Sequence, residues 1–231
     1  MTRMPGRAAA APLPVVSALL PALAACAALL ATGCHPSSVG TGPPAVKLGS
    51  RTLAVLPFAT PARSYFESKV GARLSRQIAT AVRAGCPSAT VLDVDGILAR
   101  LAAKGVEAPK AGRFSVVKLG ELLGADFVAF GEVHELSGRP PKSFGVLRGK
   151  MVLSARVEDI RVPGKRSVVW LVERQQYHYP PLFLGKDEIA AEETDEEVVV
   201  KRVMAEAAHG IAAVFTGRRP SFDERLGKDL E

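Results

Sequence analysis

The sequence predicts an α/β (α+β) sandwich, in which helices flank a mixed sheet of about five strands that ends in a C-terminal antiparallel hairpin. Apolar runs alternate with amphipathic stretches along the first half of the chain, which is typical of strands alternating with helices. Two neighbouring strand patterns joined by a tight turn follow, and a long helical pattern comes last. The predicted order is strand, helix, strand, helix, helix, strand, strand, strand, helix.

The first elements follow from the spacing of apolar residues. Residues 52–58 form an apolar run between turn-forming residues, as expected for a strand that is buried on both faces. Residues 64–84 predict an amphipathic helix that ends at Gly85, because apolar side chains recur there every four residues. These side chains are Phe66, Val70, Leu74, Ile78 and Val82. Residues 89–92 predict a short second strand.

Two short helices and a buried strand come next. Either Asp93 or Asp95 caps the second helix, because a carboxylate can accept hydrogen bonds from the unpaired N–H groups of a helix start. Residues 115–123 predict the third helix, and Gly124 ends it. Residues 126–133 are strongly apolar and predict a strand in the interior of the sheet.

The second half of the domain predicts a hairpin and a last helix. Apolar and polar residues alternate over residues 150–158, and residues 167–175 predict the next strand. Residues 162–165 read Val-Pro-Gly-Lys and predict the turn between these strands. Residues 194–197 predict a capping box that opens the last helix, which continues to Phe215.

The first 33 residues have the layout of an export signal. A basic start with Arg3 and Arg7 precedes 24 uncharged residues rich in Ala and Leu, and the small Gly33 stands before Cys34. This ending resembles the lipobox of bacterial lipoproteins, in which the signal is cut before the cysteine and the cysteine is acylated. The resemblance implies cleavage between Gly33 and Cys34 and attachment of Cys34 to a lipid bilayer.

Two other interpretations of this segment stay open. An uncharged stretch of about 20 residues can span a bilayer as a plain anchor, although Pro12, Pro14 and Pro21 argue against a stable spanning helix. The second alternative is a signal peptide that is cleaved without lipid attachment, since Ala31 stands where the lipobox most often has Leu. All three interpretations export the domain. Because His35 is not the Asp that favours inner-membrane retention, we expect an anchor in the outer membrane of the cell envelope, facing the periplasm.

The remaining chain divides into a tether, a domain and a tail. Residues 34–50 are rich in Ser, Gly and Pro and predict a lipidated N-terminus with a flexible tether, because this composition buries too little apolar area to fold. The 16 residues from His35 reach about 50 Å at most. Residues 51–216 predict one α/β domain, and residues 217–231 predict a charged tail.

Charge and cysteine content limit the classes of partner and site. The net charge is +7, and removal of the two signal arginines leaves 28 basic against 23 acidic residues, or +5, with no long block of one sign. A mixed solvated surface is therefore expected, and no nucleic-acid partner. Cys86 alone follows the lipidation site, so no disulfide can form within the mature domain. We interpret Cys86 as a small buried hydrophobe rather than a nucleophile.

A ten-residue motif carries a resemblance to a known family. Residues 117–126 read Val-Lys-Leu-Gly-Glu-Leu-Leu-Gly-Ala-Asp and lead into a strand that ends in Gly-Glu-Val at residues 131–133. Together with the strand at residues 52–58 and the helix after it, this pattern resembles the periplasmic lipoproteins of the CsgG, LpoB and TolB N-terminal type. Within the motif, we expect Gly120 to allow close packing and Gly124 to form a left-handed helix end.

The resemblance implies a non-catalytic, membrane-tethered module that binds partners in a cell-envelope assembly. Members of this group are secretion-channel subunits, activators of peptidoglycan synthases or accessory proteins. Channel-forming members insert long hairpins, and each membrane strand needs about 9 to 11 residues. Residues 137–149 are too short for two such strands, and residues 176–193 are acidic and contain two prolines. Pore formation by this chain is therefore not expected.

No catalytic, cofactor or metal motif accompanies this pattern. Residues 138–150 lack the glycine spacing and the Ser or Thr of a phosphate-binding loop. The seven carboxylates in residues 187–197 are interpreted as favourable charge before a helix start. None of the four histidines lies in a metal-ligand spacing: His35, His134, His178 and His209. We expect no enzyme, no cofactor and no metal; the alternatives are an envelope enzyme and a small-ligand sensor.

Two segments are candidates for contact with a protein partner, because loops that combine aromatic and basic side chains suit such binding. The first is a basic loop around one aromatic ring, with Arg139, Lys142, Phe144 and Arg148. The second is aromatic and proline-rich, with Tyr177, Tyr179 and Phe183. The alternative, that the second segment packs back on the domain, stays open, and so does the oligomeric state.

Overall fold

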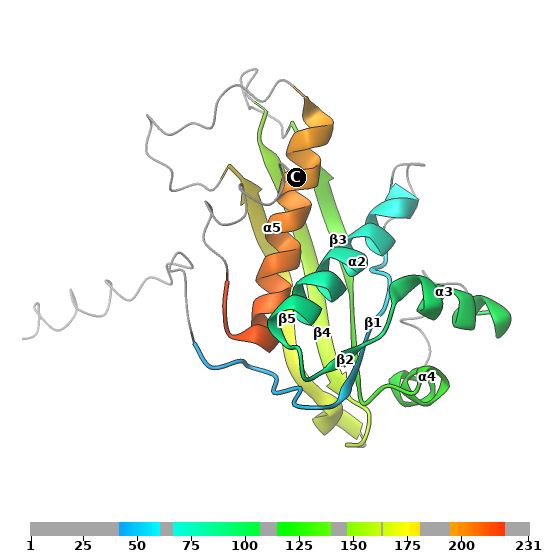
Figure 1. Ribbon diagram of the computed structural model, residues 1–231. Coiled ribbons are helices and arrows are strands. Elements are labelled where there is room, and N and C mark those ends of the chain that lie inside the picture. Colours follow the sequence, from blue (N-terminus) through cyan, green and yellow to red (C-terminus); the bar gives the residue numbers. More distant parts are fainter. Residues whose placement is uncertain are drawn as a thin grey trace, which may run out of the picture. The chain divides into compact units, whose positions relative to one another are not determined.

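Figure 1 shows the computed structural model, which describes residues 42–60, 67–106, 115–139, 147–162, 164–180 and 195–219. Five strands form one mixed sheet in the order β2-β1-β3-β4-β5. β1 runs parallel to β2 and β3, whereas β4 runs antiparallel to both β3 and β5. The strands are β1 (Thr52–Val55), β2 (Thr90–Val91), β3 (Phe127–Ser137), β4 (Gly149–Asp159) and β5 (Val168–Tyr179). The predicted fold class is confirmed.

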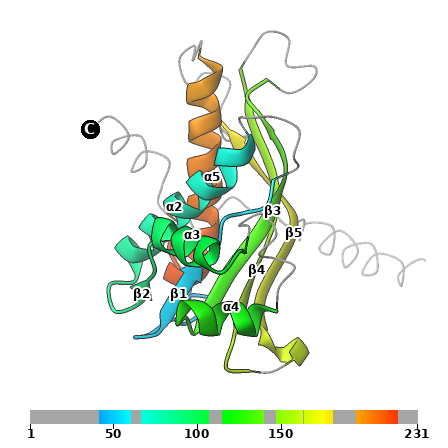
Figure 2. The same cartoon turned by 90° about the vertical axis from the view of Figure 1, so that its right-hand side faces the viewer.

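Helices cover both faces of the sheet, but unequally. The helices are α2 (Glu67–Gly85), α3 (Val94–Ala103), α4 (Val116–Leu123) and α5 (Glu196–Thr216), and a short 3-10 helix, η2 (Gly164–Ser167), lies in the turn before β5. α2 and α5 pack together on the inner face, and α5 contacts β4 and β5. α3 and α4 pack on the other, outer face, against β1 and β3 (Figure 2). The predicted order of strands and helices is confirmed.

The inner face holds the larger core. Alternate residues of β4 point into it, as the alternation in the sequence predicts, and they meet the apolar sides of α2 and α5. The β4 residues are Met151, Leu153, Ala155 and Val157, each at most 4% exposed. The facing helix residues include Leu74, Ile78, Val82, Val203, Ile211 and Phe215. Each large apolar side chain buried in this way contributes about 1.5 to 3 kcal/mol of transfer free energy.

The outer face holds a second, smaller core under α3 and α4. Ala54 of β1, Leu56 just after it, and Val128 and Phe130 of β3 pack there against the helices. The helix residues are Ile97, Leu101, Val116, Leu119 and Leu123. β1 and β3 are therefore buried on both faces, which explains why their sequences are continuous apolar runs rather than alternating ones.

The motif at residues 117–126 connects α4 to β3 and also contacts the end of β4 and the start of β1. A Cβ on Gly120 would lie 2.6 Å from a side-chain carbon of Ile160, so only glycine lets α4 approach the end of β4 this closely. Gly124 ends α4 in the left-handed conformation, with φ of 68°. The carboxylate of Asp126 accepts a hydrogen bond of 2.9 Å from the N–H of Thr52, which begins β1. Both expectations for the glycines are confirmed.

Element ends differ from the prediction where pairing or capping decides them. β3 continues to Ser137 because Glu135, Leu136 and Ser137 pair with β4 beyond a bulge. β5 continues to Tyr179 because its second half pairs with the start of β4. The cap of α3 is Asp93, whose side chain accepts from the N–H of Gly96, and the cap of α5 is Asp195 rather than Thr194 of the predicted capping box.

Residues 42–50, here called the strap, fold onto the domain. The N–H of Gly42 donates to the carbonyl of Gly217, and the N–H of Val46 donates to the carbonyl of Val214, each at 3.0 Å. The side chains of Val46 and Leu48 are 3% exposed and belong to the inner core. The folded domain thus includes part of the predicted tether. The part of the tether outside the strap, residues 34–41, lies outside the described residues.

A substitution at Gly131 of β3 tests whether β3 must lie this close to β4 and to Phe58, which follows β1. A Cβ at this position would lie 2.2 Å from the backbone oxygen of Ser154 and 2.5 Å from the ring of Phe58. We expect Gly131→Ala to lower the free energy of unfolding by about 1 to 3 kcal/mol, measured by urea denaturation. The control is Gly96→Ala in α3, where the new Cβ meets nothing closer than 3.8 Å. That variant gains up to about 1 kcal/mol of helix propensity, and equal losses in both variants would contradict the packing argument.

Candidate functional site

Part of the predicted site lies outside the described residues. This part comprises the cleavage and lipidation positions Gly33 and Cys34 and the loop residues Lys142, Phe144 and Phe183. The structure describes the other four candidates for partner contact: Arg139, Arg148, Tyr177 and Tyr179.

Arg139 and Arg148 come together at the upper end of the sheet in Figure 1, where β3 and β5 end and β4 begins. The N–H of Arg148 donates to the carbonyl of Gly138 at 2.9 Å, and the N–H of Arg139 donates to the hydroxyl of Ser137 at 3.1 Å. Both side chains are exposed. The backbone thus presents two cations at one end of the sheet, and their role in partner contact stays a prediction.

Tyr177 and Tyr179 lie in the inner core instead. Their side chains are 9% and 3% exposed. The ring of Tyr177 packs against Gly210 of α5, where a Cβ would lie 2.5 Å from the ring, and burial raises the pKa of Tyr177 to about 12. The hydroxyl of Tyr179 accepts a hydrogen bond from Arg202. The burial of both rings favours the interpretation that this segment packs back on the domain.

The outer face of β5 exposes an apolar surface that is not among the predicted contact residues. Val168, Val169 and Leu171, here called the β5 patch, are 37%, 40% and 54% exposed. Leu171 pairs with Arg156 and Val168 with Glu158, which both lie on the outer face of β4. A strand covered on one face should alternate, whereas residues 168–172 are all apolar. This unbroken apolar run is the feature of the sequence that indicates an apolar outer face on β5.

The β5 patch is accessible to a binding partner through the face of the strand, whereas the hydrogen-bonding edge of the strand is less suited to binding. β5 is the last strand of the sheet, and its pairing with β4 shifts register twice, once within the patch between Val168 and Trp170 and once beyond it between Val172 and Gln175. At the second shift Arg174 takes a positive φ of 49°, and its N–H donates to the hydroxyl of Ser154 at 3.0 Å. Bulges of this kind bend an edge away from strand addition by another chain.

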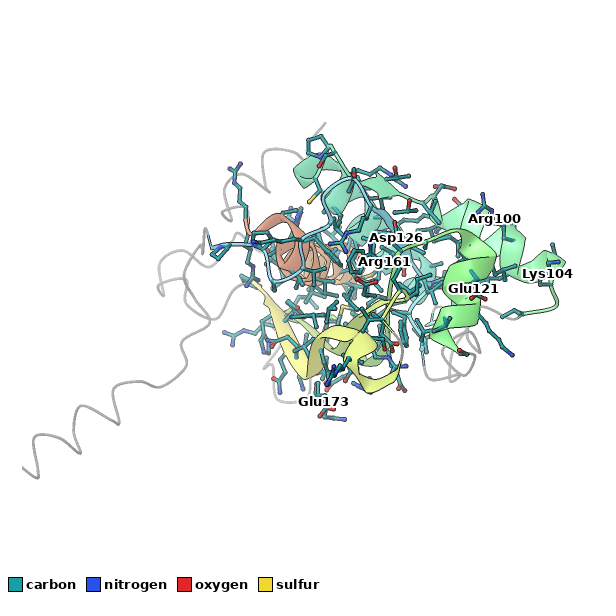
Figure 3. All side chains as sticks on the ribbon, turned by 90° about the horizontal axis from the view of Figure 1, so that it is seen from below. Arg100, Lys104, Glu121, Asp126, Arg161 and Glu173 are labelled. Atoms are coloured by element: carbon teal, nitrogen blue, oxygen red, sulfur yellow. The ribbon has the colours of Figure 1, made fainter. Side chains whose placement is uncertain are left out.

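Charged side chains surround the β5 patch. The guanidinium of Arg156 lies 4.2 Å from the centre of the Phe130 ring, and its Nε lies 3.2 Å from the carboxylate of Glu158. Glu158 is almost buried and also accepts a hydrogen bond from Ser167. Arg166 and Arg174 are exposed beside the patch, together with Glu173, which is labelled in Figure 3. On η2 and β5, the described exposed charged residues beside the patch are therefore two arginines and one glutamate.

A charged cluster fastens the lower end of the sheet, where β1, β3 and β5 begin and β4 ends. A carboxylate oxygen of Asp159 lies 2.7 Å from Nη2 of Arg161 and 3.4 Å from Nη1 of Arg51. Arg161 also lies 3.9 Å from Asp126, and Figure 3 shows these two residues close together. The guanidinium of Arg51 lies 4.4 Å from the centre of the Phe127 ring. The hydrogen bonds from Arg161 hold the pKa of Asp159 below its usual value.

His134 and Cys86 form hydrogen bonds within the domain. Nε2 of His134 lies 2.7 Å from the hydroxyl of Ser154. The thiol of Cys86 donates to the carbonyl of Phe215, and burial raises its pKa, which disfavours the reactive thiolate. In the described parts of the chain, no three His, Cys, Asp or Glu side chains converge to hold a metal ion. No helix within those parts has the length and apolar character to cross a bilayer.

Comparison with known proteins gave matches among solved structures. No family model matches the sequence, and no curated protein matches it significantly. Lipoprotein GNA1162 from Neisseria meningitidis is 14% identical, and the match covers 68% of this chain and 98% of that chain with a TM-score of 0.44. PelC from Paraburkholderia phytofirmans, a dodecamer, is 12% identical, covering 80% and 95%, with a TM-score of 0.39.

The LpoB C-terminal domain from Salmonella enterica is also among the matches. It is 13% identical, and the match covers 58% of this chain and 84% of that chain with a TM-score of 0.32. Because all three TM-scores lie below 0.5, the functional proposal below rests on this chain's own residues. The CsgG and TolB part of the resemblance stays a prediction.

The charged cluster around Asp159 at the lower end of the sheet should make the stability of the domain depend on pH. A carboxyl whose pKa is lowered in the folded state stabilises the fold above its unfolded pKa of about 3.9, and this stability is lost as the pH falls through the folded pKa. We expect Asp159→Asn to lower the free energy of unfolding at pH 7 by about 2 kcal/mol, and to flatten its decrease between neutral and acidic pH.

Denaturant unfolding from pH 7 to pH 2 measures both effects. The matched control is Asp95→Asn, because Asp95 pairs with Arg76 on the exposed surface, where solvent screens the interaction. An Asp159→Asn variant with the same acid dependence as the native chain would show that the cluster does not stabilise the fold.

Proposed function

We propose that this chain is an exported lipoprotein, anchored in the outer membrane through acylated Cys34 and facing the periplasm. Its domain acts as a non-catalytic binding module in a cell-envelope assembly, of the secretion-accessory or peptidoglycan-synthase-activator type. The observation that carries the proposal is the strap. Its hydrogen bonds to the last turn of α5 and its two buried side chains make it part of the domain.

The strap limits how far the domain can move from an anchor at Cys34. Eight residue steps separate Cys34 from Gly42, and a fully extended chain of that length spans roughly 28 Å. A lipid on Cys34 therefore holds the domain beside the bilayer. Two or three acyl chains make such attachment durable, because each buried methylene contributes roughly 0.8 kcal/mol.

The upper end of the sheet is the proposed contact surface for a protein partner. β3 and β4 are 11 residues long, so their two ends lie about 34 Å apart. The strap leads into Arg51 at the lower end, whereas Arg139 and Arg148 lie at the upper end. A partner can thus reach these arginines while the anchor holds the lower end near the membrane.

The lipid anchor is tested by acyl labelling. In cells fed an alkyne fatty acid, we expect the native chain to take up label and Cys34→Ala to take up none, because acylation requires that thiol. Cys86→Ala is the matched control and keeps its label, since that thiol is partly buried within the domain. Label on Cys34→Ala would contradict the anchor.

The upper contact surface is tested by photo-crosslinking in intact cells. A photoreactive amino acid in place of Arg148 is expected to form a discrete adduct with an envelope protein, which mass spectrometry identifies. The same amino acid in place of Lys104, an exposed residue at the end of α3, serves as the control and gives none. The same adduct from both positions, or no adduct from position 148, would contradict the assignment of this surface.

A further inference from the structure

The β5 patch lies at the lower end of the sheet, where the strap leads into β1. Val168 begins β5 and pairs with Glu158, which precedes Asp159 in β4. Asp159 in turn contacts Arg51, the residue that follows the strap. The β5 patch, on the outer face, and the end of the strap therefore belong to the same end of the sheet, where β1 and β5 both begin in Figure 1.

The chemistry of the patch suits a lipid surface. Its three exposed side chains are aliphatic, and the neighbouring exposed cations are guanidinium groups, which bind phosphate oxygens through paired hydrogen bonds. Apolar side chains combined with cations bind at the boundary between headgroups and acyl chains of anionic bilayers. On β5 itself Glu173 is the exposed acid beside them, whereas Glu158 of β4 is nearly buried and bonded to Ser167.

Two properties of the same surface disfavour a second copy of this chain as its occupant. The bulges within and beside the patch oppose strand pairing across the edge of β5. A symmetric face-to-face contact would bring Arg166 and Arg174 of one copy toward the same cations of the other, and such like-charge contacts are unfavourable.

We propose that the β5 patch docks on the anionic phospholipid surface of the membrane in which Cys34 is anchored. The proposal rests on the lipid anchor of the proposed function. Docking places the outer face of β5, at its lower end, on the bilayer, whereas Arg139 and Arg148 lie at the other end of the strands, about 34 Å away.

The test compares two cysteine substitutions in the lipidated full chain, both in a Cys86→Ala background. Leu171→Cys lies in the patch, and Val117→Cys is the matched control, because Val117 is the exposed aliphatic residue of α4. Each protein is reconstituted into vesicles of phosphatidylethanolamine and phosphatidylglycerol, or of phosphatidylcholine alone. The rate of reaction with a membrane-impermeant maleimide is measured before and after detergent is added, and circular dichroism verifies that both variants fold.

We expect the cysteine at position 171 to react more slowly in anionic vesicles than in detergent, and the one at position 117 to react equally in both. Arg166→Gln and Arg174→Gln should each weaken this protection about fivefold, because a cation near an anionic surface contributes about 1 kcal/mol. Equal rates at positions 171 and 117 in anionic vesicles would overturn the proposal. So would protection that is the same in neutral vesicles, or that rises with the ratio of protein to lipid, which indicates a second copy.

Vesicle flotation separates this proposal from the anchor on which it rests. Failure of the lipidated chain to float with vesicles would overturn the anchor, and docking with it. Flotation with equal rates at both cysteines would overturn docking alone and leave the anchor standing.

Discussion

One nearly buried carboxylate holds the lower end of the fold together. Asp159 forms ion pairs with Arg161, two residues later, and with Arg51, just before β1. Both guanidinium groups also lie over the ring of Phe127. An unpaired charge at this position would be costly, so the ends of three strands and the strap stay in one arrangement. The relative positions of the strap, the β5 patch and the upper end of the sheet depend on this arrangement.

The order of elements could be predicted from the sequence because each element carries its own apolar period. Their ends could not, since contacts distant in sequence decide them: Glu135 to Ser137 extend β3 only because β4 lies alongside. The strap was missed for a related reason. Its Ser, Gly and Pro content predicts a flexible chain, but Val46 and Leu48 find places in a core built by α2 and α5.

The candidate site was predicted less completely than the fold. Aromatic residues near prolines left open whether Tyr177 and Tyr179 contact a partner or pack back on the domain, and both rings complete the inner core because β5 continues that far. The β5 patch is the opposite case. An apolar run such as residues 168–172 predicts a doubly buried strand, and only the placement of α3 and α4 over β1 and β3 leaves the outer face of β5 exposed.

The hydrogen bond between Gly42 and Gly217 brings the first and last parts of the described domain together. A unit with adjoining termini can be spliced into a surface loop of an unrelated host without stretching either flank, and it tolerates relocation of its ends. The same architecture could therefore serve as a cassette within larger polypeptides, with its sheet directed away from the site of insertion.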